Sequence, residues 1–274
     1  MINQKLSILF IIITITSSFT LSQTIYIKGT IQHTRWKEFN ATLWTFHVHP
    51  KTEIYDPSSE IFTTFNERIS AITMQDQKKI QSLPVKIASK FPNLKIYEAY
   101  NCSVMEVAKE NFEKLVHLRA IDLQYNELIA VPETAFADQI NLVFLNLAHN
   151  KILRIYEKAF ENLKSLRMLY LGWNQIEILP KNLLRNMPNL RKIGLTSNNL
   201  KRISNEHFQG NNRLTYIWLN ENKIEVIEDE KIFDSTKESL KSVDMELNRC
   251  INKIYSSNEL GSLSKDIKRN CKKR

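Results

Sequence analysis

Residues 142–152 read LVFLNLAHNKI, and the same arrangement of leucines, one asparagine and a final leucine or isoleucine recurs on both sides of this stretch. Copies begin at residues 118, 142, 166, 190 and 214, so that successive first leucines are 24 residues apart. A fixed period of this length indicates one supersecondary unit repeated along a solenoid, in which each unit contacts only its neighbours.

Each copy contains a short alternating segment, such as Leu145, Asn146 and Leu147, which predicts a β-strand with its leucines in the core. An asparagine follows each strand, where the chain turns and backbone groups point inward without a strand partner. A buried side-chain amide can satisfy these groups. We therefore expect a ladder of buried asparagines at Asn126, Asn150, Asn174, Asn198 and Asn222, with Cys102 at the equivalent position one unit earlier.

The second half of each unit carries one large apolar residue at the same period of 24: Phe112, Phe136, Phe160, Leu184, Phe208 and Ile232. These residues predict an apolar spine on the side opposite the strands. A single unit buries about seven apolar side chains worth ~2 kcal/mol each, against an entropy cost of ~1–2 kcal/mol for every residue. One unit would not fold alone, so stacking is obligatory.

The repeats span residues 69–250, with a degenerate first unit at residues 69–94 and a last unit whose Asn248 keeps the ladder position. Before them, residues 25–31 and 43–48 alternate with period two, which predicts a β-hairpin within an N-terminal cap of residues 23–68. After them, Leu260, Leu263 and Ile267 have helical spacing, with Ser257 or Asn258 as N-cap. Residues 251–274 are therefore expected to form a helical C-terminal cap.

Residues 1–22 have the features of a signal peptide: Lys5, an apolar run at residues 6–15, and small residues before Gln23. Cleavage is predicted after Ser22, with Ser18 as the alternative site. The other interpretation is a retained N-terminal anchor, but the apolar run is shorter than the ~20 residues that span a bilayer. No later stretch is apolar enough to cross a membrane, so we predict a secreted, extracellular protein.

Two asparagines, Asn40 and Asn101, begin N-glycosylation sequons, which agrees with a secretory route. The chain has three cysteines. Because Cys250 and Cys271 bracket the expected C-terminal helix, we predict that they form a disulfide. Cys102 is then either a buried thiol in the place of an asparagine or one half of an intermolecular bridge.

The pattern L-x-x-L-x-L-x-x-N-x-L at a period of 24, with Phe in the second half, resembles the leucine-rich repeat proteins of the typical extracellular class. Residues 91–97 (FPNLKIY) also look like secreted insect members of that family. Those proteins commonly carry a cysteine pair in the N-terminal cap, which this chain lacks. The resemblance implies a curved α/β solenoid, a horseshoe with a parallel β-sheet on its concave face, that binds proteins or glycans and usually has no catalytic activity.

Strand alternation places three sets of side chains on or beside the concave face. The first lane is Ile96, Ala120, Phe144, Met168, Lys192, Tyr216 and Ser242. The second lane is Glu98, Asp122, Asn146, Tyr170, Gly194, Trp218 and Asp244. The edge row, just after the strands, is Asn101, Tyr125, His149, Trp173, Ser197 and Glu221.

Large apolar residues gather in the middle of this face although the leucines already fill the core. We expect the concave ligand-binding site to consist of Phe144, Met168, Tyr170, Trp173, Tyr216 and Trp218. An exposed aromatic patch marks a recognition site. The alternative is that neighbouring rings only stack on one another for stability.

The formal net charge of +9 favours acidic partners, and the C-terminus holds a second candidate site. The candidate polyanion-binding residues are Lys265, Lys268, Arg269, Lys272, Lys273 and Arg274. A solvated tail is the other interpretation. Of the acidic partners, a sulfated glycan agrees with secretion, whereas a nucleic acid does not.

Motifs for catalysis and for metal or cofactor binding are missing from the sequence. Asp122 and Asp244 share a lane but lie five repeats apart, too far to act as a paired acid and base, so we do not expect an enzyme. The expected function is recognition of an extracellular protein or glycoprotein, in defence, adhesion or signalling. The alternative is a structural matrix protein that is attached to acidic glycans through its basic C-terminus.

Overall fold

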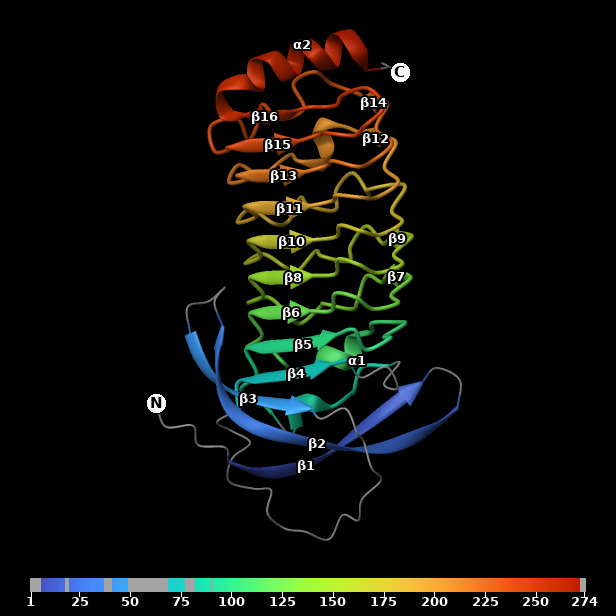
Figure 1. The fold of residues 1–274 in the computed structure, drawn as a ribbon, viewed down its shortest axis with the longest axis vertical. Helices are drawn as coiled ribbons and strands as arrows, with labels where there is room; N and C mark the ends of the chain where they lie inside the picture. Colours follow the sequence, from blue (N-terminus) through green and yellow to red (C-terminus); the bar gives the residue numbers. More distant parts are fainter. Residues whose placement is uncertain are drawn as a thin grey trace.

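The computed structural model describes the backbone of residues 6–17, 20–36 and 41–48, and the backbone and side chains of residues 69–76, 82–89 and 91–271. In this described part of the chain, twelve strands form one sheet, stacked in chain order along the long axis of the molecule (Figure 1). Strands β1 (Leu6–Ser17), β2 (Thr20–Trp36), β3 (Ala41–Val48), β4 (Ala71–Gln75), β5 (Ile96–Tyr100) and β6 (Ala120–Asp122) form its N-terminal half. Strands β8 (Phe144–Asn146), β10 (Met168–Tyr170), β11 (Lys192–Gly194), β13 (Tyr216–Trp218), β15 (Ser242–Asp244) and β16 (Ile254–Ser256) form the other half.

From β3 to β15 neighbouring strands pair in parallel, and within the repeats each residue lies beside its counterpart in the next unit. Leu145 pairs with Leu169, which pairs in turn with Ile193. All three side chains are fully buried. This arrangement confirms the predicted solenoid with a parallel sheet on one face.

The asparagine ladder is present, and Asn174 illustrates its geometry. Its Oδ1 accepts the Ile152 N–H at 3.0 Å, and its Nδ2 donates to the carbonyl oxygens of Leu147 and Leu171, both at 3.0 Å. The same contacts recur around Asn150, Asn198 and Asn222. Each amide thus links its own turn to the preceding repeat.

Cys102 occupies the ladder position with a different set of hydrogen bonds. Its thiol is fully buried, and its single S–H is shared between the Tyr100 carbonyl at 3.2 Å and the Met74 carbonyl at 3.5 Å. The Cys102 N–H donates to Asn126 Oδ1 at 2.9 Å. The sulfur therefore lies in the core, as the buried-thiol interpretation expects.

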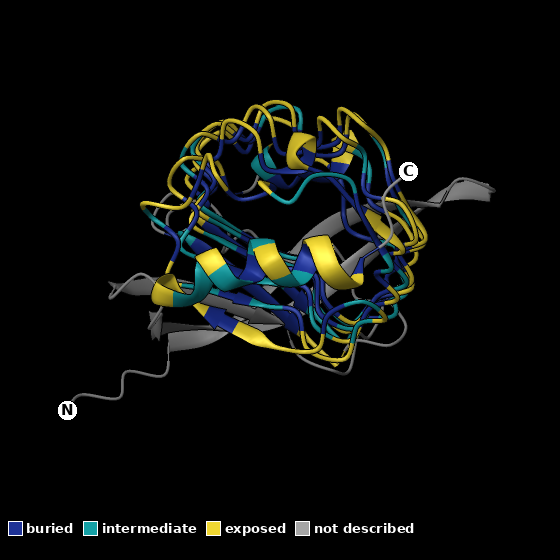
Figure 2. Ribbon diagram, turned by 90° about the horizontal axis from the view of Figure 1, so that it is seen from above, coloured by how far each residue is buried: buried dark blue, intermediate teal, exposed yellow. Residues whose placement is uncertain are grey.

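Short segments and turns form the side opposite the sheet, and the predicted spine lies beneath them. They include α1 (Lys109–Phe112), the 3-10 helices η2 (Ile87–Ser89) and η3 (Asn205–His207), and two strand pairs: β7 (Ala130–Val131) with β9 (Arg154–Ile155), and β12 (Arg202–Ile203) with β14 (Val226–Ile227). Every spine residue is buried, and the Phe112 and Phe136 rings stack with centroids 5.6 Å apart. Seen along the axis in Figure 2, buried residues line the inside of the coil and exposed residues its outside.

The N-terminal strands extend the sheet beyond the first repeat. β2 and β3 form an antiparallel hairpin in which Gly29 pairs with Val48 and Trp36 with Ala41. β3 then pairs in parallel with β4. β1 pairs with β2 and coincides with the predicted signal peptide, so cleavage after Ser22 would remove β1 and the first three residues of β2.

The C-terminal end closes with a strand and a helix. β16 pairs antiparallel with β15, an element that the repeat pattern did not predict. A 3-10 turn, η4 (Ser257–Glu259), leads into α2 (Leu260–Asn270), which buries Leu263 and Ile267. The expected N-cap at Ser257 or Asn258 is wrong, because both residues lie within the 3-10 turn and Glu259 is the N-cap of α2. Ser256 precedes the turn, and its Oγ donates to Glu259 at 2.9 Å. The structure joins Cys250 and Cys271 in a disulfide with a Cα–Cα distance of 4.9 Å.

Candidate functional site

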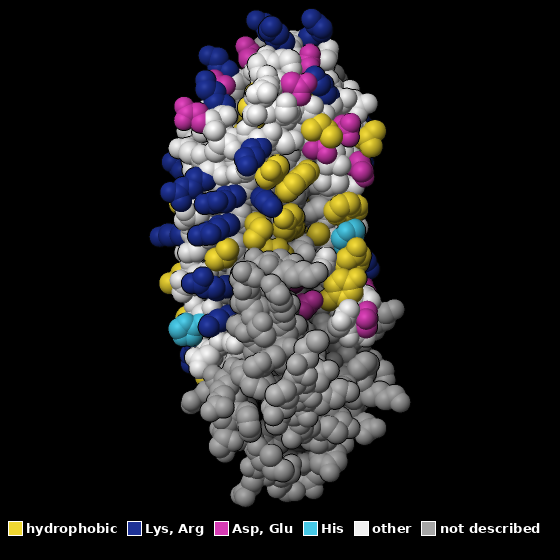
Figure 3. All heavy atoms as spheres, turned by 60° about the vertical axis from the view of Figure 1, so that its left-hand side comes forward, with side chains coloured by type: hydrophobic (Ala, Val, Ile, Leu, Met, Phe, Trp, Pro, Cys, Tyr) yellow, Lys and Arg dark blue, Asp and Glu magenta, His cyan; other side chains and the backbone are white. Residues whose placement is uncertain are grey.

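Five of the six predicted ligand-binding residues lie together on the sheet face. β8 presents Phe144, β10 presents Met168 and Tyr170, and β13 presents Tyr216 and Trp218. We call these five residues the aromatic patch. All five are half-buried, whereas the residues between them on the same strands are fully enclosed. Figure 3 shows hydrophobic side chains gathered in the middle of this face, beside a column of Lys and Arg side chains.

Ring contacts connect the patch from one end to the other. The Phe144 and Tyr170 centroids are 5.8 Å apart, those of Tyr170 and Trp218 6.3 Å, and those of Tyr216 and Trp218 5.7 Å with nearly parallel planes. The Lys192 ammonium lies 5.5 Å from the centroid of the Tyr216 ring. Tyr216 is therefore in contact with both an indole and a cation.

Gly194 allows two of these rings to meet across an intervening strand. Tyr170 and Trp218 lie on β10 and β13, with β11 between them. A Cβ at Gly194 would lie 3.0 Å from Cδ1 of Tyr170, so the tyrosine ring occupies the space that a side chain on β11 would fill. Burial in this position raises the pKa of Tyr170. The sequence placed Gly194 in the second lane without showing this role.

Trp173 lies outside the patch, in a second aromatic group formed by the edge row. The His149 ring is parallel to the rings of Tyr125 and Trp173, with centroids 4.1 Å and 4.5 Å away. All three residues have positive φ angles, which aligns their side chains in successive turns. Tyr125 is 42% and Trp173 49% exposed, whereas desolvation lowers the pKa of His149. The sequence identified the row but not the stack.

The N-terminal part of the concave face differs from the expected open surface. Ile96 and Ala120, in the first lane, are 2% and 3% exposed and form a small core cluster with Ala71. Phe144 packs against this cluster. The exposed part of the first lane therefore begins at Phe144. In the second lane, Asp122 and Asp244 are separated by four strands, which places them ~24 Å apart.

Those predicted glycan and polyanion positions that the structure describes lie outside the patch. Asn101 is half-buried, and its Nδ2 donates to Asp76 Oδ1 at 2.6 Å. Lys265, Lys268 and Arg269 are exposed on α2. Asn40, Lys272, Lys273 and Arg274 lie outside the described residues.

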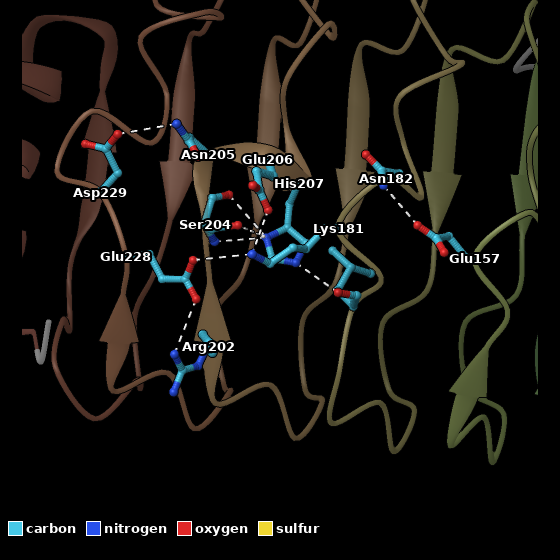
Figure 4. Close-up of polar contacts among 11 residues, drawn as sticks. Glu157, Lys181, Asn182, Arg202, Ser204, Asn205, Glu206, His207, Glu228 and Asp229 are labelled. Carbon is cyan, nitrogen blue, oxygen red and sulfur yellow. Dashed lines mark hydrogen bonds and ion pairs between the residues drawn. The ribbon is translucent and has the colours of Figure 1, made fainter. Parts of the chain in front are cut away.

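A hollow of about 430 Å³ lies on another flank of the solenoid, next to β12 and β14. Figure 4 shows Lys181 between Glu206 and Glu228, at 2.7 Å and 3.7 Å, and Arg202 at 3.3 Å from Glu228. The hydrogen bond with Glu206 raises the pKa of Lys181, and the same bond lowers the pKa of Glu206. These ion pairs neutralise one another, so the hollow offers no excess charge that would select a ligand.

His207 lies at the base of this hollow and is buried. Its Nδ1 accepts the Ser204 N–H at 2.9 Å, and its Nε2 donates to the Leu179 carbonyl at 2.9 Å, which corresponds to a neutral imidazole. The side chain caps η3 and links it to the preceding repeat, a structural role.

Within the described residues, no group of three His, Cys, Asp or Glu side chains is arranged to hold a metal ion. The helices in this part of the chain are all too short or too polar to span a membrane.

Comparisons with solved structures show the fold. The structure is similar to the crystal structure of the TLR13–ssRNA13 complex, with a TM-score of 0.61 and 22% identity over 66% of this chain and 25% of that chain. It is also similar to that of the mouse RP105/MD-1 complex, with a TM-score of 0.59 and 22% identity over 66% of this chain and 31% of that chain. The chain thus matches less than a third of the length of either structure. No curated protein matches it.

The family assignment rests on the repeats themselves. The leucine rich repeat family model matches residues 101–152, 116–176 and 188–249, which together make up half of the chain. These segments contain the aromatic patch, the edge-row stack and the whole asparagine ladder. The chain belongs to the leucine-rich repeat family.

Proposed function

We propose that this protein is a secreted recognition module that binds an extracellular protein or glycoprotein through the aromatic patch, with Trp173 at its border. The process would be defence, adhesion or signalling. The observation that carries the proposal is the patch itself: five large side chains are half-exposed on a face whose core positions are already filled. Leucine-rich repeat domains are generally protein-interaction modules, which supports this assignment.

Secretion is supported by three features of the chain. Residues 1–22 have the pattern of a signal peptide, and Asn40 and Asn101 begin sequons. The Cys250–Cys271 disulfide suits an oxidising compartment.

Ring geometry favours a protein ligand over a nucleic acid, although the TLR13 structure is a complex with ssRNA. Single-stranded nucleic acids bind by stacking their bases on open ring faces. Here both faces of His149 are covered by Tyr125 and Trp173, and Tyr216 contacts Trp218 and Lys192. The half-exposed rings of the aromatic patch suit the apolar and polar side chains of a protein surface.

The experiment compares Tyr170→Ala/Trp218→Ala with the parent protein. Affinity capture from the native extracellular fluid identifies a partner, and Kd is then measured with that purified partner. Loss of two central aromatic anchors should weaken binding on the order of 100-fold or more, because such residues carry ≥2 kcal/mol each in protein interfaces.

Leu153→Ala/Ile178→Ala is a matched control, because both side chains are exposed apolar residues outside the sheet face. This control should bind like the parent protein. Unchanged affinity of the patch variant would disprove the proposal. A lower unfolding temperature with unchanged Kd would show that the rings only stabilise the sheet.

A further inference from the structure

A row of cations runs along one rim of the concave sheet, immediately before the strands. It consists of Lys95, Arg119, Arg167, Arg191 and Lys241, which we call the basic row. All five side chains are exposed. None of them forms an ion pair with a residue in the part of the chain that the structure describes.

Backbone hydrogen bonds align these residues from repeat to repeat. The Arg119 N–H donates to the Lys95 carbonyl at 2.7 Å, and the Arg191 N–H donates to the Arg167 carbonyl at 2.8 Å. Two repeats have an uncharged residue at this position, Val143 and Thr215. Each of them links the cations of the repeats before and after it through the same backbone hydrogen bonds, at 2.7–2.9 Å. The row is therefore continuous over six strand spacings, or ~29 Å.

The surroundings of the basic row add positive charge. Lys192, a residue of the first lane, comes directly after Arg191 of the basic row. Arg213 is exposed and lies two residues before Thr215. The first lane, which follows the basic row directly, contains no Asp or Glu. In each repeat the residue two positions before the row is also neither Asp nor Glu. Among the residues that the structure describes, seven cations thus lie along this rim without an ion-paired carboxylate, in contrast to the ion-paired hollow next to β12 and β14.

We propose that the basic row binds a linear sulfated glycan that lies along the solenoid axis. The basic row is straight and carries a cation beside most of the strands. An unbranched polymer with regularly repeating charge matches this arrangement. Arginine predominates, and its planar guanidinium donates two parallel hydrogen bonds to a sulfate group. A sulfated glycan needs no stacking platform, whereas a single-stranded nucleic acid needs open ring faces.

This site differs from the C-terminal one that the sequence suggested. Lys265, Lys268 and Arg269 form a short cluster on α2, beside Asp266. The basic row is longer, forms no ion pair within the described part of the chain, and lies next to the aromatic patch. A glycan on the rim leaves the patch open to a protein. The inference shares with the proposed function only the extracellular location.

The test measures binding of heparin to the full chain, with Arg119→Glu/Arg167→Glu/Arg191→Glu as the row variant. Affinity at 0.15 M salt, chosen as an approximately physiological ionic strength, should fall on the order of 100-fold, at about fivefold for each lost cation. In the milder triple Arg→Gln variant, the slope of log affinity against log salt concentration should fall by roughly 3.

Two matched controls reverse the same number of charges elsewhere. Lys158→Glu/Arg185→Glu/Lys237→Glu alters exposed turns near the spine, and Lys265→Glu/Lys268→Glu/Arg269→Glu alters α2. Both should retain more heparin binding than the row variant. Equal loss in all three variants would mean general charge attraction and overturn the proposal, as would loss confined to the α2 variant.

Other polyanions distinguish the class of ligand. Desulfated heparin, single-stranded RNA and polyglutamate should bind more weakly than heparin at equal charge concentration. Tighter binding of RNA through the same arginines would overturn the glycan assignment. Tyr170→Ala/Trp218→Ala should keep its heparin affinity, so this result separates failure of the glycan site from failure of the protein site.

Discussion

At the residue scale, two small residues, Asn174 and Gly194, have large effects on the scaffold and on its surface. Asn174 satisfies one N–H and three carbonyl groups from two successive turns, the third carbonyl being that of Gly172 at 3.2 Å. Gly194 contributes by having no side chain, which lets Tyr170 reach toward Trp218. The first residue stabilises the scaffold, whereas the second shapes the surface that binds.

Asn174→Ala should lower the free energy of unfolding by about 3 kcal/mol, because buried backbone groups lose their partners. Chemical denaturation followed by circular dichroism measures this change. Asn199→Ala is the control, because Asn199 lies outside the ladder and is half-exposed. Equal midpoints for the two variants would show that the ladder does not stabilise the protein.

His149 should make stability dependent on pH. Desolvation between Tyr125 and Trp173 lowers its pKa in the folded state below the usual value of about 6.5. Between the lowered pKa of the folded state and about 6.5, the unfolded chain binds more protons than the folded chain. The free energy of unfolding therefore rises with pH up to about 6.5, and this stability is lost as pH falls through the same range. NMR titration of the imidazole should show the lowered pKa.

His149→Phe keeps a flat ring in the stack but removes the titration. The loss of melting temperature between pH 7.5 and pH 5, chosen to lie roughly either side of that window, should be smaller in this variant than in the parent protein. An identical loss in both proteins would show that other groups cause the pH dependence.

At the scale of elements, the solenoid depends on its two ends, where a repeat has no neighbour. At the C-terminus β16 pairs with the last repeat strand, and α2 covers the core with Leu263 and Ile267. Within this cap the Tyr255 hydroxyl donates to Asp266 at 2.9 Å, and an ion pair with Lys253 lowers the pKa of Glu259 to about 2. The cap is thus held by packing, hydrogen bonds and one covalent link.

Removal of that link should destabilise the C-terminal end first. Cys250→Ser/Cys271→Ser opens a loop of 21 residues, which should cost about 3 kcal/mol. Hydrogen exchange should show lost protection in α2 and β16 before the central repeats, because repeat proteins open unit by unit. Uniform loss of protection along the chain would contradict this picture.

At the scale of the whole molecule, charge and apolar surface are separated across one sheet. The basic row immediately precedes the strands, the aromatic patch lies on them, and the edge-row stack follows them. Two proposed ligands of different chemistry can therefore use adjacent strips of the same face. The core and the asparagine ladder are the same beneath both strips.

Export from the cell is the prediction that concerns the whole chain. Expressed in secretory cells, the protein should enter the medium with Gln23 as its N-terminal residue. Loss of β1 should leave the β2–β3 hairpin, whose pairing begins at Gly29. N-terminal sequencing and mass spectrometry measure this outcome.

Leu9→Arg/Ile12→Arg, in the apolar run, should keep the protein inside the cell. Treatment with an endoglycosidase should increase gel mobility, and Asn40→Gln/Asn101→Gln should abolish this shift. A secreted chain that retains Met1 would disprove the predicted cleavage.

The repeat pattern alone determined the solenoid, its strand register and the asparagine ladder. Each of these depends on spacing along the chain: a period of 24 residues brings Leu145 beside Leu169 and places an amide at every turn. The same register assigns Phe144, Tyr170 and Trp218 to one face of the sheet. Local alternation suffices because neighbouring repeats stack in only one register.

Only the tertiary structure decided how side chains on this face combine. Trp173 stacks on His149 instead of joining the patch, Tyr170 lies over Gly194, and Ile96 is enclosed on a face expected to be open. Such contacts depend on ring orientation, on φ at each turn and on the size of a neighbour 24 or more residues away. Sequence spacing contains none of these quantities, so it defined the scaffold, whereas packing between repeats defined the surface.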